Sequence, residues 1–262
     1  MDTFTLFSTE HFWFIGGGFL AVFAFIIIAA FLPRYRFAQF SALIILIIKV
    51  TELSYRHFYF GEPIKSLLPL HLCNLTLIFA ILMMFTKSPS LFQVTYYWSL
   101  GALFAIITPD VKYSFPHPLT LSFYITHFYL IFAAIYGVIF FEFKPTFRGW
   151  VDSFIFLNVL AVIIFFINSN LGTNYLYVNR IPDFTSPLDH FGKWPYYIGI
   201  VEGIYLVLTY AIYFPFRRKT FKYSTKNICL SQNFLLLLHL FMLSYAFSFF
   251  IINYILKFSV LY

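Results

Sequence analysis

Long apolar runs constrain this sequence more than any other feature. Each run of about 18 or more apolar residues is long enough to cross the ~30 Å hydrocarbon layer of a bilayer as a helix. The strict alternation expected of a membrane β-barrel is not visible in them. Charged residues make up 10% of the 262 residues, against roughly 25% in soluble proteins. We therefore expect an all-α, polytopic transmembrane helix bundle.

Eight membrane spans can be placed on the chain. They cover residues 12–32, 37–59, 68–85, 91–107, 119–141, 150–167, 194–214 and 233–256. The segment before the first span contains no Lys or Arg and carries Asp2 and Glu10, whereas a signal peptide begins with a positive region. We expect this span to be retained. The connections are short, which predicts one polytopic membrane domain over residues 1–262.

The basic residues predict an orientation. Ten Lys and Arg residues fall in the predicted inner loops and six in the outer segments, and cytoplasmic loops of membrane proteins carry the excess of positive charge. This favours a multi-pass protein of the cell membrane with its N-terminus outside. The same rule accounts for the net charge of +7, so we expect no nucleic-acid partner.

The second predicted span contains charged residues, which are costly inside a bilayer. Lys49 and Glu52 are three residues apart and Arg56 is four residues further on, so all three share one helical face and can pair. One interpretation is a structural ion ladder that ties the bundle together. The other is a site that binds lipid headgroups or tunes the charge of a neighbouring group.

Unusual polar residues gather near the outer ends of the predicted spans. They are Glu52, Arg56, His71, Cys73, Asn74, Asp110, His127, Asn168, Asn174, Tyr175 and Glu202. Few comparable residues occupy the inner halves of the spans. This asymmetry predicts a polar cavity that opens in one leaflet.

The start of the third span carries the strongest chemical signal. Pro69 suits the first turn of a helix, which would place His71, Cys73 and Asn74 in the first two turns. A thiolate is stabilised by a nearby imidazolium or by a helix N-terminus, so Cys73 is a candidate nucleophile. The alternative is that Cys73 is a small buried hydrophobic residue.

A nucleophilic cysteine needs a base, and His127 is the preferred candidate. It comes from a different span at matching depth, whereas His71 lies two residues from Cys73 and points to another helix face. His71 is a candidate for stabilising an oxyanion. Asp110 either orients His127, as the third member of a triad does, or only ends a helix after Pro109. His127 itself is alternatively a core histidine that forms a hydrogen bond between helices.

Several segments together resemble a known family. They are His71-Leu72-Cys73-Asn74-Leu75, Thr108-Pro109-Asp110, Pro116-His117, the span of His127, Asn174-Tyr175 and Gly192-Lys193-Trp194-Pro195-Tyr196-Tyr197. In this order they resemble the YwaF-like bacterial membrane proteins, which are similar to the vertebrate transmembrane protein 164. The resemblance covers residues 37–214. It implies a seven-helix family core and leaves residues 233–256 as an additional C-terminal span.

The resemblance implies an intramembrane acyltransferase that moves fatty acyl chains among phospholipids through a cysteine acyl-enzyme. It implies Cys73 as nucleophile and His127 as its partner. The androgen-induced membrane hydrolases look like distant relatives with Thr in place of the nucleophile. The acceptor expected here is a second lipid, a lysolipid or a lipoprotein amine.

The remaining expectations concern substrate contacts and competing functions. The candidate substrate-binding residues are Asn74, Arg56, Asp110, Lys112, Asn174, Tyr175 and Glu202. We expect no soluble cofactor, and one cysteine with scattered histidines does not predict a metal site. A small-molecule or ion transporter or a lipid scramblase remains the alternative; it would use the same cavity with Lys49, Glu52 and Glu202 and would not need Cys73.

Overall fold

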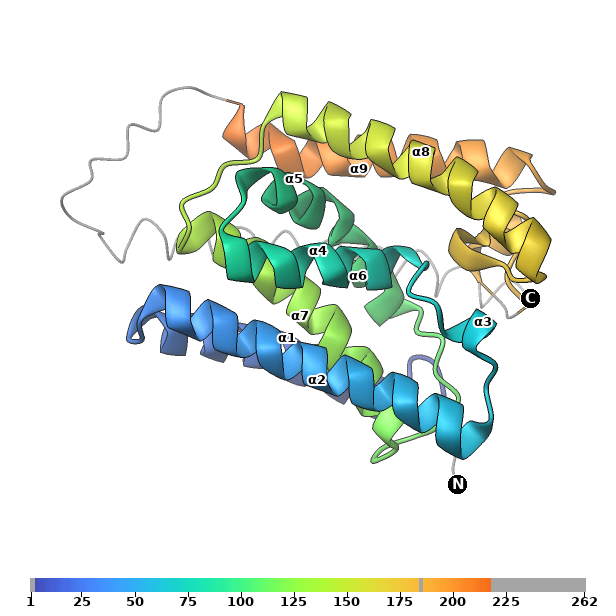
Figure 1. Ribbon diagram of the computed structural model, residues 1–262, viewed down its shortest axis with the longest axis horizontal. Helices are drawn as coiled ribbons and strands as arrows, with labels where there is room; N and C mark the ends of the chain where they lie inside the picture. Colours follow the sequence, from blue (N-terminus) through green and yellow to red (C-terminus); the bar gives the residue numbers. More distant parts are fainter. Residues whose placement is uncertain (1–2, 184–185, 218–262) are drawn as a thin grey trace. The chain divides into compact units, whose positions relative to one another are not determined.

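The computed structural model describes residues 3–183 and 186–217, and within these ranges it contains helices and no β-strand. The helices are α1 Thr9–Ala30, α2 Arg34–Phe60, α3 Ile64–Leu67, α4 Leu72–Thr86, α5 Pro89–Trp98, α6 Leu100–Ile107, α7 Pro118–Ile139, α8 Phe147–Leu171 and α9 Tyr196–Tyr213 (Figure 1). The prediction of an all-α helix bundle is confirmed. The predicted eighth span, residues 233–256, lies outside the described residues.

Local sequence signals explain where several helices begin and end. The Ser8, Ser88 and Thr146 side chains accept hydrogen bonds from first-turn N–H groups of α1, α5 and α8, which are the donors that a helix leaves unpaired. Glycines end α2 and α8, with φ of 67° at Gly61 and 68° at Gly172. This left-handed conformation suits glycine because it lacks a Cβ.

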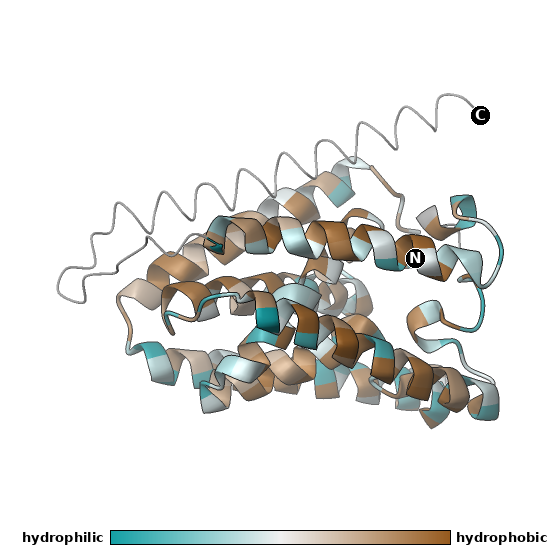
Figure 2. Cartoon of the chain, turned by 90° about the horizontal axis from the view of Figure 1, so that it is seen from above, coloured by the Kyte–Doolittle hydropathy of each residue, from teal (hydrophilic) through white to brown (hydrophobic). Residues whose placement is uncertain are grey.

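The described helices are apolar enough to cross a membrane. Six segments of at least 18 residues qualify within the described ranges, with α5 and α6 counted as one, and α4 is a shorter apolar helix. Large hydrophobic side chains such as Phe31, Phe166 and Val207 are exposed on the surface, and hydrophobic residues predominate along the helices in Figure 2. Such a surface is suited to lipid rather than to water. The chain is therefore a multi-pass membrane protein.

Helix α7 forms the centre of the bundle formed by residues 3–217. It packs against α1, α2, α4, α5 and α6, and α2 also packs against α4 (Figure 1). Helices α8 and α9 pack against each other, and α8 packs against α5. The three helices α2, α4 and α7 therefore contact one another pairwise, and they carry the candidate catalytic residues.

Two hydrogen bonds mark one end of this bundle. At one end, here called the far end, the Tyr35 hydroxyl donates to the Phe85 carbonyl at 2.6 Å, and the Tyr136 hydroxyl donates to the Arg34 carbonyl. These bonds hold the start of α2 level with the ends of α4 and α7. The opposite end, at which α4, α7 and α9 begin, is called the Cys73 end.

Two predicted spans differ from the observed helices. The third was expected to begin at residue 68, but α4 begins at Leu72 and Pro69 lies before it in a turn. The Leu68 N–H donates to the Tyr175 hydroxyl at 3.1 Å, so a distant residue holds this segment outside the helix. The fourth span is divided at Ser99, where the Ala102 N–H donates to the Ser99 carbonyl three residues back, as in a 3₁₀ turn.

Candidate functional site

Cys73 occupies the first turn of α4. It is the second residue of the helix, and His71 is the N-cap residue, whose side chain forms no capping hydrogen bond. The first N–H groups of a helix have no partner within it, and together with the helix dipole they favour negative charge. No side chain of the described residues accepts from the N–H groups around Cys73, so within this part of the chain they are available to an anion.

The position of Cys73 on α4 turns it toward the other helices. Leu77, Ala80 and Met84 lie four, seven and eleven residues after it and are buried, with 3%, 0% and 0% of their surface exposed. Residues at this spacing share one helix face. Cys73 is partly exposed at the top of that face, so its thiol lies at the end of a packed interior stripe.

Cys73, His127 and Lys49 lie at similar depth. Measured from the far end of their helices, Cys73 is 13 residues from the end of α4, His127 is 12 residues from the end of α7 and Lys49 is 15 residues from the start of α2. At 1.5 Å per residue the three depths agree to within about 5 Å. The late start of α4 at Leu72 places the N-terminus of the helix at this same depth.

The imidazole of His127 has a defined orientation. Its Nδ1 lies 2.7 Å from the Phe123 carbonyl oxygen, and because a carbonyl can only accept, Nδ1 carries the proton. In the neutral ring Nε2 is then the basic atom. Of the two interpretations of Asp110, the structure favours the one in which Asp110 does not orient His127, because a backbone carbonyl one turn away in α7 performs that role.

No hydrogen bond joins the Cys73 thiol to His127 or to any other residue in the described part of the chain. The two side chains come from helices that pack together, α4 and α7, at similar depth. Catalytic hydrogen bonds are often long or misaligned without substrate and shorten when it binds. The proton transfer expected between them therefore requires a closer approach than this structure has.

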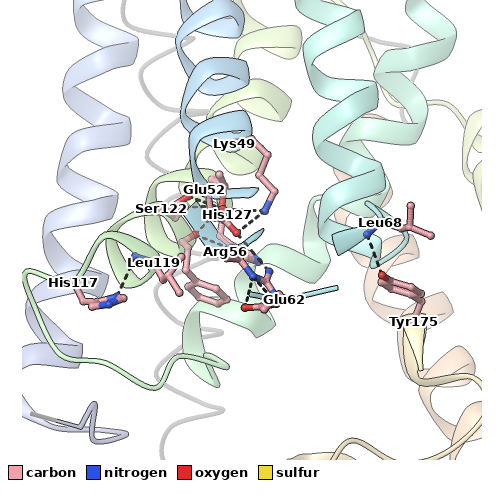
Figure 3. Close-up of polar contacts among 12 residues, drawn as sticks. Lys49, Glu52, Arg56, Glu62, Leu68, His117, Leu119, Ser122, His127 and Tyr175 are labelled. Atoms are coloured by element: carbon pink, nitrogen blue, oxygen red, sulfur yellow. Dashed lines mark hydrogen bonds and ion pairs between the residues drawn. The ribbon is translucent and has the colours of Figure 1, made fainter. Parts of the chain in front are cut away.

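The predicted pairing of charges on α2 is confirmed and extended (Figure 3). Lys49 Nζ lies 3.0 and 2.9 Å from the two carboxylate oxygens of Glu52, which also accepts from the Ser122 hydroxyl at 2.6 Å. Arg56 lies 3.7 Å from Glu52 and binds Glu62 through Nε and Nη2, with the shortest contact at 2.7 Å. We call Lys49, Glu52, Arg56 and Glu62 the ion ladder. Each of its charges has a partner within it, which favours the structural interpretation.

Lys49 connects the ion ladder to the candidate catalytic groups. Its ammonium lies within electrostatic reach of Cys73, His71 and His127. Its side chain is 16% exposed, so it is largely removed from water and lipid. Lys49 is thus the residue of the ion ladder whose charge acts on all three of these groups.

His71 lies between two tyrosine rings, with ring centroids 5.0 Å from Tyr175 and 5.3 Å from Tyr177. Burial lowers the pKa of His71 to about 4, and the charges of Arg56 and Lys49 act in the same direction. The imidazole is therefore neutral at physiological pH. A neutral imidazole donates one hydrogen bond, so His71 can still donate to an oxyanion.

The segment after α8 encloses this side of the site. The Tyr175 hydroxyl donates to the Lys65 carbonyl at 2.8 Å and accepts from Leu68. Asn168, 1% exposed, holds the segment by four hydrogen bonds from both ends of its amide. Asn174 bonds to the backbone of Arg180. Tyr175 and Asn174 thus act in the described structure by positioning the segment beside His71.

The other predicted substrate-binding residues lie around or outside this cluster. Asp110 is exposed and within electrostatic reach of Arg56 and Lys112, and it lies at the rim of the site. The Lys112 side chain is exposed, while its carbonyl accepts from the Phe4 N–H. Glu202 lies on α9, which packs against α8, and it forms no hydrogen bond or ion pair with the described residues. The structure does not bring Glu202 to Cys73.

Sequence reasoning did not select Ser122, Glu62 or Tyr177. Glu62 follows Gly61, which ends α2. A turn of the chain at this glycine was the available signal that Glu62 could reach Arg56. Ser122 and Tyr177 reach the site from distant segments, so no local pattern identifies them. Within the described residues no group of three or more His, Cys, Asp or Glu side chains is placed to hold a metal ion.

Comparison with known proteins decides the family. The sequence model of the TMEM164 family matches residues 6–213. The chain belongs to the TMEM164 family. This match includes α1, which precedes the region of the sequence resemblance, and it ends at the last residue of α9. Every helix described above therefore lies within the family match.

One curated relative is an uncharacterized protein of Treponema pallidum (strain Nichols), which is 27% identical over 122 residues. The aligned stretch covers 47% of this chain and 51% of that protein. The chain thus spans about half the length of the curated relative that it matches. No solved structure matches the chain significantly.

Proposed function

We propose that this protein is an intramembrane acyltransferase in which Cys73 carries the acyl group as a thioester and His127 transfers the proton. The observation that carries the proposal is the common depth of the Cys73 thiol and the His127 imidazole on two packed helices. Membership in the TMEM164 family is consistent with it.

In the first step the Cys73 sulfur attacks the ester carbonyl carbon of a phospholipid, and the thiol proton passes to His127 Nε2. The ester C–O bond then breaks, and His127 returns this proton to the leaving alkoxide, which departs as a lysolipid hydroxyl. The product on the protein is a Cys73 thioester. An acceptor hydroxyl or amine attacks it, loses its proton to His127, and the released thiolate recovers that proton.

The start of α4 supplies donors for the negative charge that develops on the carbonyl oxygen. The N–H groups at Cys73 and Asn74 are in the uncapped first turn, and donors aimed at such an oxygen are a major source of catalysis in acyl transfer. The neutral His71 ring and the Asn74 amide lie at the same helix end. We assign the oxyanion site to this group.

The headgroup contact is assigned to the rim. Arg56 is bound by Glu62 in the described structure, so it reaches a phosphate only by exchanging that partner. Lys112 is exposed and lies near Asp110. Within the described residues it forms no ion pair that it would have to give up to bind a phosphate. A lysolipid or a lipoprotein amine is the proposed acceptor, and membrane phospholipid is the proposed donor.

Acyl turnover by purified protein in phospholipid vesicles tests this proposal. Release of lysolipid and transfer of a labelled acyl chain to an added lysolipid are measured by mass spectrometry. Cys73→Ser and His127→Gln are each expected to reduce transfer by at least about a hundredfold, the scale of a lost nucleophile or general base.

Two matched variants control for the loss of a cysteine or a histidine. Cys229→Ser removes the second cysteine of the sequence, and His190→Gln removes an exposed histidine outside the cluster. Both are expected to retain full transfer. Unchanged transfer in folded Cys73→Ser protein would exclude the proposed mechanism.

A further inference from the structure

A narrow groove lies between α2 and α4 beside the candidate nucleophile. Its volume is about 160 Å³, and its lining includes Lys49 and Asn74 among apolar side chains such as Leu46, Ile78 and Ile81. Small-molecule pockets commonly measure about 300–1,000 Å³. The groove is therefore suited to a thin chain rather than to a bulky headgroup.

Lys49 and Asn74 are the two residues of the groove lining that carry side-chain hydrogen-bond donors, and the rest of the lining is apolar. Asn74 is the neighbour of Cys73 in the chain, and Lys49 lies at the depth of Cys73. Ile78 and Ile81 follow Asn74 by four and seven residues on α4, so the apolar part continues toward the far end for about 10 Å. The groove thus has two residues with hydrogen-bond donors at the depth of Cys73 and an apolar lining that continues from them toward the far end.

The groove opens to the lipid-facing surface. Leu46 is 41% exposed and Ile78 is 40% exposed, while Ile81 is 8% exposed and forms the deeper wall. A lipid chain can therefore enter from the side without passing through water.

Lys49 and Asn74 have hydrogen-bonding capacity for a ligand. A lysine ammonium has three N–H groups, and the Lys49 contacts to the two Glu52 oxygens leave one for another acceptor. The ester of a phospholipid presents carbonyl oxygens, which accept but cannot donate. Lys49 and the Asn74 amide are complementary to these oxygens in charge and in hydrogen bonding.

We propose that this groove binds the acyl chain of the donor phospholipid and that Lys49 and Asn74 donate to its ester oxygens beside Cys73. This inference rests on the proposed function, because it names the substrate site of that reaction. It adds the path of lipid entry and makes Ile78 and Ile81 the residues that limit the length of chain accepted. Lys49 gains a role in substrate binding in addition to its place in the ion ladder.

Photolabelling tests the groove independently of catalysis. The Cys73→Ser protein is placed in phosphatidylcholine vesicles that contain a phosphatidylcholine with a diazirine in one acyl chain, and adducts are mapped after irradiation. Adducts are expected on the groove-lining parts of α2 and α4. Ile78→Trp fills the groove and is expected to reduce them about tenfold, a size typical of steric exclusion from an apolar pocket.

Leu82→Trp is the matched control, because Leu82 is 43% exposed on the same helix and does not line the groove. It is expected to leave the adducts unchanged. Adducts spread evenly over the exposed apolar faces, or an equal response to the two tryptophan variants, would overturn the inference. One outcome is that Cys73→Ser abolishes acyl transfer, while Ile78→Trp changes neither transfer in the protein with Cys73 nor labelling in the Cys73→Ser protein. The groove is then not the acyl-chain site, and the proposed function stands. If adducts behave as expected while Cys73→Ser retains transfer, the proposed function is wrong and the groove is a lipid site.

Discussion

Removing Glu52 while leaving Lys49 in place should strongly destabilise the bundle. Glu52 is 10% exposed, and it binds the Lys49 ammonium through both carboxylate oxygens and accepts from Ser122. In Glu52→Met the Lys49 charge loses its partner, at a cost of about 3–5 kcal/mol when a buried pair is broken from one side. Arg56 keeps its three hydrogen bonds to Glu62 and adds little to this cost.

The double variant Lys49→Met/Glu52→Met removes both charges together. Replacing a whole buried pair with apolar residues is often neutral, so the remaining expected cost is about 1 kcal/mol for the unpaired Ser122 hydroxyl. Equilibrium unfolding in mixed micelles, followed by helical circular dichroism, measures the two values. A Glu52→Met variant no less stable than the double variant would refute the reasoning that the ladder is a desolvated ion pair.

Three further predictions follow from particular contacts. Lowering the pH from 6.5 toward 4 should reduce the free energy of unfolding of the wild type. The pKa of His71 is lower in the folded protein than in the unfolded chain, so in this range the unfolded chain binds more protons. His71→Phe should therefore make the unfolding midpoint less dependent on pH. Asn168→Ala should cost about 2–4 kcal/mol in the same unfolding assay, because two buried and two part-buried hydrogen bonds are lost, and a cost below 0.5 kcal/mol would contradict its assigned role. Gly18→Ala should lower stability by about 1–3 kcal/mol, because the new Cβ would lie 1.9 Å from the Phe128 ring, whereas at Gly17 nothing lies within 4 Å and the same change should be tolerated.

The fold follows from the sequence wherever the information is local. Long apolar runs predicted the described spans, and the caps at Ser8, Thr146 and Gly172 mark helix ends by their own chemistry. The start of α4 could not be predicted in this way. Its apolar run continues back through Leu68, but the Leu70 N–H donates to the Leu68 carbonyl in a tight turn around Pro69, and Tyr175 from a distant segment binds the Leu68 N–H.

The candidate site likewise combines features that local sequence predicts with contacts that come from distant segments. Helical spacing predicted that Lys49 and Glu52 pair, since both residues lie on one helix. The hydroxyl of Ser122 on another helix completes that pair, and no spacing rule reaches it. The depth match of Cys73 with His127 was predicted from span positions, but the group that orients His127 is a backbone carbonyl, which leaves no signature in a sequence.

The most direct test of the account is the chemical state of Cys73 during turnover. Protein mixed with phospholipid is quenched in acid, digested and examined by mass spectrometry for an acylated Cys73 peptide. The account predicts an acyl adduct on Cys73 that neutral hydroxylamine removes, as expected of a thioester, and that accumulates when no acceptor is supplied. Transfer of the labelled chain with Cys73 unmodified at every time point would contradict it.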